Sequence, residues 1–297
     1  FDSYNERLNE IEASYASEYG FENLQKTQEE FEAALATVAT QEYAAIELTN
    51  DIEWTTGAEI GSTPLIDANA ITKNLVIYGN GSKLIAKGSG VGSIRMANGG
   101  TLTLNDVVVI DESVSYAENS WEYGYLEFAG KIVFNNCVFE NAIMVQSEKN
   151  EVVSNVCFNT CAFNSNDAQQ YDVWVADGRV FFNDCDIEGY RGIKMHEAYG
   201  SEVVEVVIDG CRFTNLSKKP GVAMGDLNAD TKVVIKNSTI TKAEGGSKAA
   251  AIGNKFWAGT NIVIKNSTLG DIFGGNASAA IGGSRYSDDI SAENKQA

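Results

Sequence analysis

A short unit of alternating apolar and polar residues recurs along most of the chain. Seven copies begin at Leu104, Phe134, Phe158, Phe182, Ile208, Ile235 and Ile264, at intervals of 24 to 30 residues. The clearest copies read FNNCVF, FNTCAF and FNDCDI. Alternation with a period of two is typical of β-strands, and a repeat of this length is typical of a solenoid. The pattern therefore predicts a chain that winds in similar coils and does not fold around one central core.

Each copy of the unit contains a position at which the chain bends between two strands. This position holds Asp106, Asn136, Thr160, Asp184, Gly210, Asn237 and Asn266. Asn, Asp and Gly tolerate the left-handed backbone conformation, so we expect that conformation at the bend. Thr160 does not fit, because β-branched residues avoid it.

A further short strand recurs once in each coil. Its copies lie at 94–96, 126–128, 143–145, 173–175, 193–195, 222–224, 250–252 and 279–281. With the two halves of the repeated unit, each coil then supplies three strands. Stacked coils would form three parallel sheets, so we predict a parallel β-helix of about eight coils over residues 43–297.

The first 42 residues have a different period. Apolar side chains recur at alternating intervals of three and four residues, at Phe1, Tyr4, Leu8, Ile11 and Tyr15. This spacing predicts an amphipathic helix within residues 1–26. A second helix is predicted from Thr27, which forms a capping box with Glu30. We expect residues 1–42 to cap the β-helix, because its first coil would otherwise present open strand edges.

The net charge of −19 excludes the classes of partner that need a basic face, namely nucleic acid and anionic membrane surfaces. No apolar run reaches the roughly 18 residues of a membrane span. The sequence begins at Phe1 and contains no signal peptide, and no repeat follows residue 283. We therefore expect a fragment of a longer chain that continues past Ala297.

Four of the five cysteines occupy the same position of the repeat: Cys137, Cys161, Cys185 and Cys211. Neighbouring parallel strands are about 4.8 Å apart, and their side chains are parallel, which does not suit a disulfide. We predict a ladder of buried free thiols. A metal site is the alternative, but no His or CxxC motif accompanies these residues.

The recurring unit, with the opening segments 46–52 and 71–81, resembles the right-handed parallel β-helices of the pectate-lyase-like superfamily. Segments 250–253, 261–264 and 279–283 resemble glycine-rich repeats of large secreted bacterial proteins. The resemblance covers about residues 43–290. It implies an all-β fold and a secreted or cell-surface location on a bacterium. One scaffold hosts many functions, so the motifs specify architecture and say little about chemistry.

Outward residues of successive coils would gather one group of polar and aromatic side chains on the face formed by the short strands. The group contains Trp174, Lys194, His196, Asp177, Glu197 and Asp226. The superfamily resemblance implies a substrate groove on this face. Trp174 offers a flat ring to a sugar, Lys194 a cation to a uronate carboxylate, and the three carboxylates oxygen ligands to Ca²⁺.

Two other interpretations of this patch stay open. The side chains could be solvated charges in turns. In a polysaccharide lyase, Ca²⁺ would acidify the proton beside the uronate carboxylate, and Lys194 or Arg191 would be the base. Neighbouring carboxylates favour the charged form of Lys194, which counts against a base. The sequence contains no close group of acids with a following Arg-x-Lys, which counts against a glycosidase.

Aromatic residues cluster in the loop 115–125 and in equivalent connections. Trp121, Tyr123 and Tyr171 are the candidates for a carbohydrate platform, because loops on a rigid scaffold commonly carry function. The alternative is that these rings fold back over the loop itself.

The outward middle residue of the strand that opens each unit is apolar or small along most of the chain. It is Thr103, Val133, Cys157, Phe181, Val207, Val234 and Val263. An exposed stripe of this length is unusual on a monomer. Either the N-terminal amphipathic segment or a neighbouring subunit or domain would cover it. A neighbouring subunit would mean self-association through Val133, Phe181, Val207, Val234 and Val263.

The sequence thus favours an extracellular β-helix that binds glycan or mediates surface adhesion without turnover, with Ca²⁺ as a candidate cofactor and carbohydrate or another surface protein as partner. The alternatives are a polysaccharide lyase for acidic glycan and a purely structural stalk.

Overall fold

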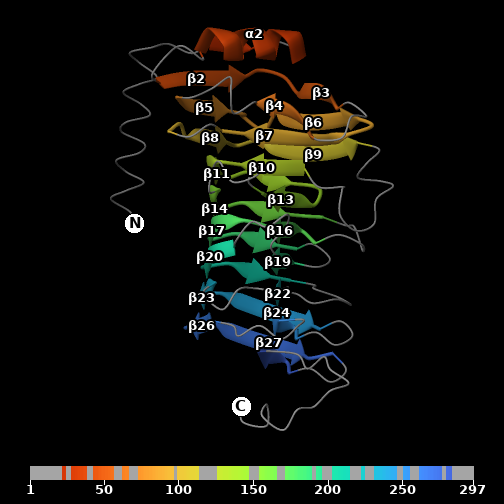
Figure 1. Ribbon diagram of the computed structural model, residues 1–297, viewed down its shortest axis with the longest axis vertical. Coiled ribbons are helices and arrows are strands. Elements are labelled where there is room, and N and C mark those ends of the chain that lie inside the picture. The colour runs from red at the N-terminus through yellow and green to blue at the C-terminus, as the bar shows by residue number, and fades with distance from the viewer. Residues whose placement is uncertain are drawn as a thin grey trace.

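The computed structural model describes residues 22–24, 28–38, 43–56, 62–66, 73–96, 99–113, 126–146, 154–165, 171–188, 192–195, 203–214, 222–224, 231–245, 250–254, 261–275 and 279–282. They form an elongated stack of coils with the helix α2 at one end (Figure 1). Apart from α2 (Gln28–Val38), every regular element in these ranges is a β-strand. The expected all-β class is confirmed.

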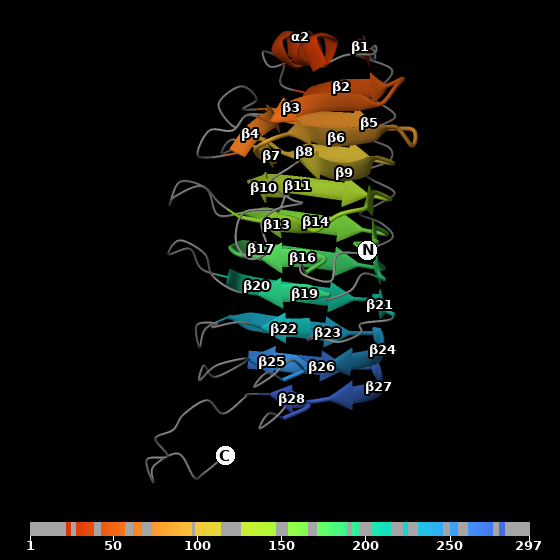
Figure 2. The same ribbon diagram turned by 90° about the vertical axis from the view of Figure 1, so that its right-hand side faces the viewer.

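Three parallel sheets run the length of the stack (Figure 2). The first sheet has ten strands: β1 (Glu22–Leu24), β2 (Tyr43–Leu48), β5 (Asn74–Tyr78), β8 (Leu102–Asn105), β11 (Lys131–Asn135), β14 (Asn155–Asn159), β17 (Gly178–Asn183), β20 (Val203–Asp209), β23 (Lys232–Lys236) and β26 (Asn261–Lys265).

The second sheet has nine strands: β3 (Ile52–Thr56), β6 (Lys83–Gly88), β9 (Val108–Ser113), β12 (Val138–Phe139), β15 (Ala162–Phe163), β18 (Asp186–Ile187), β21 (Arg212–Phe213), β24 (Thr239–Glu244) and β27 (Thr268–Phe273). The third also has nine: β4 (Ser62–Ile66), β7 (Val91–Arg95), β10 (Leu126–Ala129), β13 (Ile143–Val145), β16 (Val173–Val175), β19 (Ile193–Met195), β22 (Val222–Met224), β25 (Ile252–Asn254) and β28 (Ile281–Gly282). These numbers are close to the eight coils expected.

The bend between the first and second sheets confirms the prediction of a left-handed residue in each coil. Asp106, Asn136, Thr160, Asp184, Asn237 and Asn266 have φ between 48° and 54°, and Gly210 has φ of 69°. Thr160 adopts this conformation in spite of its β-branched side chain. Its backbone N–H donates to the carbonyl of Asn183 in the next coil at 2.8 Å, and the bend residues Asp106, Asn136, Asp184, Gly210 and Asn237 donate in the same way. The stacked backbone therefore imposes the conformation.

Phenylalanine side chains form columns in the narrow core. The rings of Phe134, Phe158 and Phe182 stack at centroid distances of 5.1 Å, and all three side chains are fully buried. Phe139 and Phe163 stack beside them at 4.9 Å. Like residues therefore meet like residues along the axis, which holds successive coils in one register.

The helix α2 closes one end of this core. Phe31 and Leu35 are buried and join the same apolar cluster as the first coil, and α2 contacts β1, β2 and β3. Residues 22–24, which follow the apolar positions of the predicted first helix, form the strand β1 and pair in parallel with β2. The sequence pattern did not predict this strand. The rest of that segment, and Thr27 of the expected capping box, lie outside the described residues.

The third sheet differs from the expected alignment of short strands at both ends. Ser93 rather than Arg95 lies opposite Glu127, and Gly253 rather than Ala251 lies opposite Ala223. Each difference is a shift by two residues. Such a shift keeps every side chain on its own face of the sheet, so the alternation of apolar and polar residues does not reveal it.

Candidate functional site

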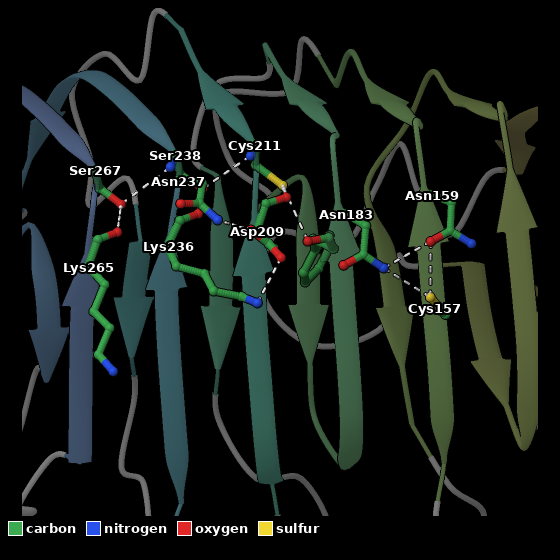
Figure 3. Close-up of polar contacts among 11 residues, drawn as sticks. Cys157, Asn159, Asn183, Asp209, Cys211, Lys236, Asn237, Ser238, Lys265 and Ser267 are labelled. Atoms are coloured by element: carbon green, nitrogen blue, oxygen red, sulfur yellow. Dashed lines mark hydrogen bonds and ion pairs between the residues drawn. The ribbon is translucent and has the colours of Figure 1, made fainter. Parts of the chain in front are cut away.

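The four repeated cysteines are buried free thiols, as predicted. Each Sγ lies 3.3 to 3.6 Å from two carbonyl oxygens, one two residues earlier and one in the preceding coil. Ser238 and Ser267 continue the column, and their hydroxyls donate to the carbonyls of Lys236 at 2.7 Å and Lys265 at 2.8 Å (Figure 3). Because serine replaces cysteine in the same role, the column is a hydrogen-bonding part of the scaffold.

Two of the thiols, Cys161 and Cys157, are poorly suited to nucleophilic chemistry. Burial raises the pKa of Cys161 well above its ordinary value. Burial, with a smaller contribution from Cys185, also raises the pKa of the half-buried Cys157 to about 11. The thiolate is the reactive form of cysteine, and at neutral pH both side chains remain protonated thiols.

The adjacent strands β16 and β19, with the connection that leads into β16, bring three of the predicted site residues together. Lys194 Nζ lies 3.7 Å from the centroid of the Trp174 ring and 5.9 Å from that of Tyr171. Trp174 is only 5% exposed and packs with Met144 in an apolar cluster outside the main core. The ammonium of Lys194, which is partly exposed, therefore lies over an indole that is itself buried.

The other predicted site residues have different outcomes. Asp177 is buried, with 7% of its surface exposed. The rest lie outside the described residues: Arg191, His196, Glu197, Asp226, Trp121 and Tyr123. Among the residues that the structure does describe, no three His, Cys, Asp or Glu side chains are grouped so that they could hold a metal ion.

The stripe on the first sheet is aligned as the sequence predicts. Strand register places Thr103, Val133, Cys157, Phe181, Val207, Val234 and Val263 in one column. The column extends upstream to Ala45 and Val76. Apart from Thr103, which is buried, these side chains are half-buried, since each is shielded by the rungs on either side.

A column of asparagines beside the stripe was missed by sequence reasoning. Asn135 Nδ2 donates to Asn105 Oδ1 at 2.8 Å, Asn159 to Asn135 at 2.8 Å, and Asn183 to Asn159 at 2.9 Å. Figure 3 shows the end of this asparagine ladder at Asn183. The signal that could have revealed it is the second residue of the repeated unit, which is asparagine in four successive copies.

Beyond Asn183 the column becomes charged. Asp209 accepts hydrogen bonds from Lys236 Nζ and Asn237 Nδ2, both at 2.8 Å (Figure 3). Partial burial opposes ionisation of Asp209, but these two donors outweigh it and hold its pKa below the ordinary value. Lys236 and Asn237 therefore occupy both oxygens of the Asp209 carboxylate. This end of the column is a local polar network within the scaffold.

Comparison with known families gives the classification. Residues 26–173 match the family model described as a pectate lyase-like adhesive domain. The protein is a pectate-lyase-like β-helix. No curated protein and no solved structure matches the chain.

The adhesive description of the matched domain indicates a role of this pectate-lyase-like β-helix in adhesion or at a surface. The matched residues end at Val173, so they include Tyr171 but stop short of Trp174 and Lys194. The single described helix is too short and too polar to cross a membrane.

Proposed function

We propose that the protein is a bacterial cell-surface or secreted adhesion module that binds an acidic glycan without turning it over. The observation that supports this most directly is Lys194 on the third sheet. Its ammonium contacts the face of Trp174 and lies over the more distant ring of Tyr171, and the side chain is partly exposed. The adhesive-domain match supports the surface role.

Trp174 does not offer an open platform on which a sugar ring could stack. Its ring is buried and its face is occupied by Lys194. A cation over an aromatic face is held electrostatically, so the indole fixes the position of the ammonium. Lys194 then offers a carboxylate a preorganised positive charge, and Tyr171, which is half-buried, offers an apolar edge to the sugar.

The same contact supports binding without turnover. The ring face stabilises the charged ammonium, which attracts a uronate, whereas a catalytic base must be a neutral amine. We also propose Ca²⁺ as an auxiliary cofactor that Asp177, Glu197 and Asp226 hold. Further contacts with the glycan would come from His196, Trp121 and Tyr123. Two or more carboxylates with nearby oxygen donors suit this ion.

Retention on immobilised polygalacturonate with Ca²⁺ tests the proposal. We expect Lys194→Ala to weaken binding about tenfold or more, because a charge-assisted hydrogen bond contributes about 1.5–3 kcal/mol. Lys194→Arg should keep most of the affinity. Lys242→Ala is the matched control, since Lys242 is an exposed lysine on the second sheet. Equal binding by all four proteins would overturn the role of Lys194.

Ultraviolet absorbance of the same mixtures separates the alternatives. Appearance of unsaturated product, lost in Lys194→Ala or Arg191→Ala, would show a lyase and not a binding module. If the protein neither binds polygalacturonate nor releases unsaturated product, with or without Ca²⁺, the structural stalk is the interpretation that remains. Removal of Ca²⁺ with a chelator should weaken retention if the three carboxylates hold the ion.

A further inference from the structure

One face of the β-helix carries an apolar column between two polar ones. The column from Ala45 to Val263 occupies the middle of the first sheet, and the asparagine ladder lies on one side of it. The other side carries Lys131, Asn155, Arg179, Glu205 and Lys232, and all of these except the half-buried Glu205 are exposed. A single apolar row with polar borders matches the narrow apolar face of one amphipathic helix.

The border opposite the asparagine ladder carries more positive than negative side chains, since Glu205 lies between Arg179 and Lys232 as its one carboxylate among the described residues. Lys232 Nζ pairs with Glu205 at 2.7 Å, whereas neither Lys131 nor Arg179 forms an ion pair with any other residue that the structure describes. Both lie on the border of the stripe, on the strands that flank Cys157. In a chain with a net charge of −19, two exposed cations that form no ion pair among the described residues favour an acidic occupant, although Arg179 lies opposite Glu205.

We propose that residues 1–20 form an amphipathic helix that lies along this stripe as an intramolecular cover. The segment has apolar residues at Phe1, Tyr4, Leu8, Ile11 and Tyr15, and it carries five acidic residues against one basic residue. It suits both the apolar column and the cations beside it.

The attachment point of the segment supports this placement. The strand β1 follows the segment directly and pairs with β2 at the edge of the first sheet. The C-terminal end of the segment is therefore attached at the end of the stripe. Twenty helical residues extend about 30 Å, and six strand spacings of about 4.8 Å cover the same length. Six spacings lead from β1 to β17, which carries Phe181.

The length of the helix also determines which of its residues should meet which residues of the stripe. Cys157 lies on β14, five strands from β1, which is about 24 Å along the stack. Residue 4 lies about 25 Å from residue 21 in a helix. Tyr4 should therefore cover Cys157, and Phe1 should meet Phe181.

Cys157 is a native reporter of the cover, because it is the half-buried thiol while the other four cysteines are in the core. Modification of Cys157 by a maleimide, followed by peptide mapping, should be about tenfold faster after deletion of residues 1–20, since docking limits access. Leu8→Glu with Ile11→Glu in the full chain should act in the same way. A synthetic peptide of residues 1–20 should restore protection, and the peptide with the two glutamates should not.

Oxidative cross-linking checks the register. Tyr4→Cys should form an intramolecular disulfide with Cys157, whereas Tyr15→Cys, about 16 Å further along the helix, should not. Intermolecular cross-links with protection that depends on concentration would instead assign the stripe to a second copy. Unchanged modification rates in the deletion and double-glutamate variants would overturn the proposal, as would equal cross-linking at both positions.

Discussion

Thr160 is the residue at which coil geometry and side-chain preference disagree. It has a φ of 54°, where its neighbours in the column are Asn136 and Asp184. A β-branched side chain in the left-handed region is strained, and the strain persists only because hydrogen bonds on both sides fix the backbone. The sequence shows the conflict directly, since six of seven bend residues are Asn, Asp or Gly.

Thr160→Asn should therefore stabilise the protein. We expect the free energy of unfolding to rise by about 1 kcal/mol, because asparagine tolerates left-handed backbone. Urea denaturation followed by circular dichroism measures the change. Asn266→Thr is the reciprocal control at an exposed bend with φ of 48°, and it should lower stability by a similar amount. A destabilised Thr160→Asn variant would show that the threonine side chain makes a compensating contact.

Asp111 is a second residue whose environment conflicts with its chemistry. It is 4% exposed, Oδ1 accepts from the backbone N–H of Ser113 at 2.9 Å, and Oδ2 has no hydrogen-bond partner in the described structure. Burial raises its pKa above the ordinary value. The folded state then binds the proton more tightly than the unfolded state, so stability falls as pH rises from the ordinary carboxyl pKa through the folded pKa.

Asp111→Asn should remove this loss of folding stability at higher pH. At neutral pH we expect the variant to be more stable than the parent by about 1–2 kcal/mol, because no unpaired charge is buried. The difference should shrink as pH falls below the ordinary carboxyl pKa, where the parent is protonated in both states. Thermal unfolding over a pH series measures it, and Asp51→Asn, an exposed carboxylate, should change little. A constant difference at all pH values would contradict the assignment.

At the scale of the strand, columns of identical residues replace the varied packing of a globular core. The bends, the thiols and the apolar stripe could be predicted from sequence, because a repeat fixes which residues stack. The buried indole of Trp174 could not, because its cover comes from Met144 and Lys194 on adjacent strands. Nor could the two-residue shift at Gly253, since alternation is unchanged by an even shift.

The asparagine ladder should contribute to strand pairing. Asn159 donates to Asn135 and accepts from Asn183 and from the Cys157 thiol, so Asn159→Ala breaks three side-chain bonds at once. We expect a loss of about 1–3 kcal/mol, because partly buried amides are left unpaired. Asn155→Ala, on the same strand but exposed, is the matched control and should be nearly neutral. Hydrogen exchange of the β14 amides would show whether the loss is local, and equal effects in both variants would contradict it.

The whole molecule is a rod in which backbone hydrogen bonds run along the long axis. Tension applied at the two ends would therefore pull directly on the bonds between one coil and the next, and not shear strands past each other. The phenylalanine stacks and the asparagine ladder lie in the same direction and would share that load. Because coils are joined in series, the weakest interface would open first. A surface protein built in this way would lengthen under load by releasing coils one at a time, while the remaining coils keep their shape.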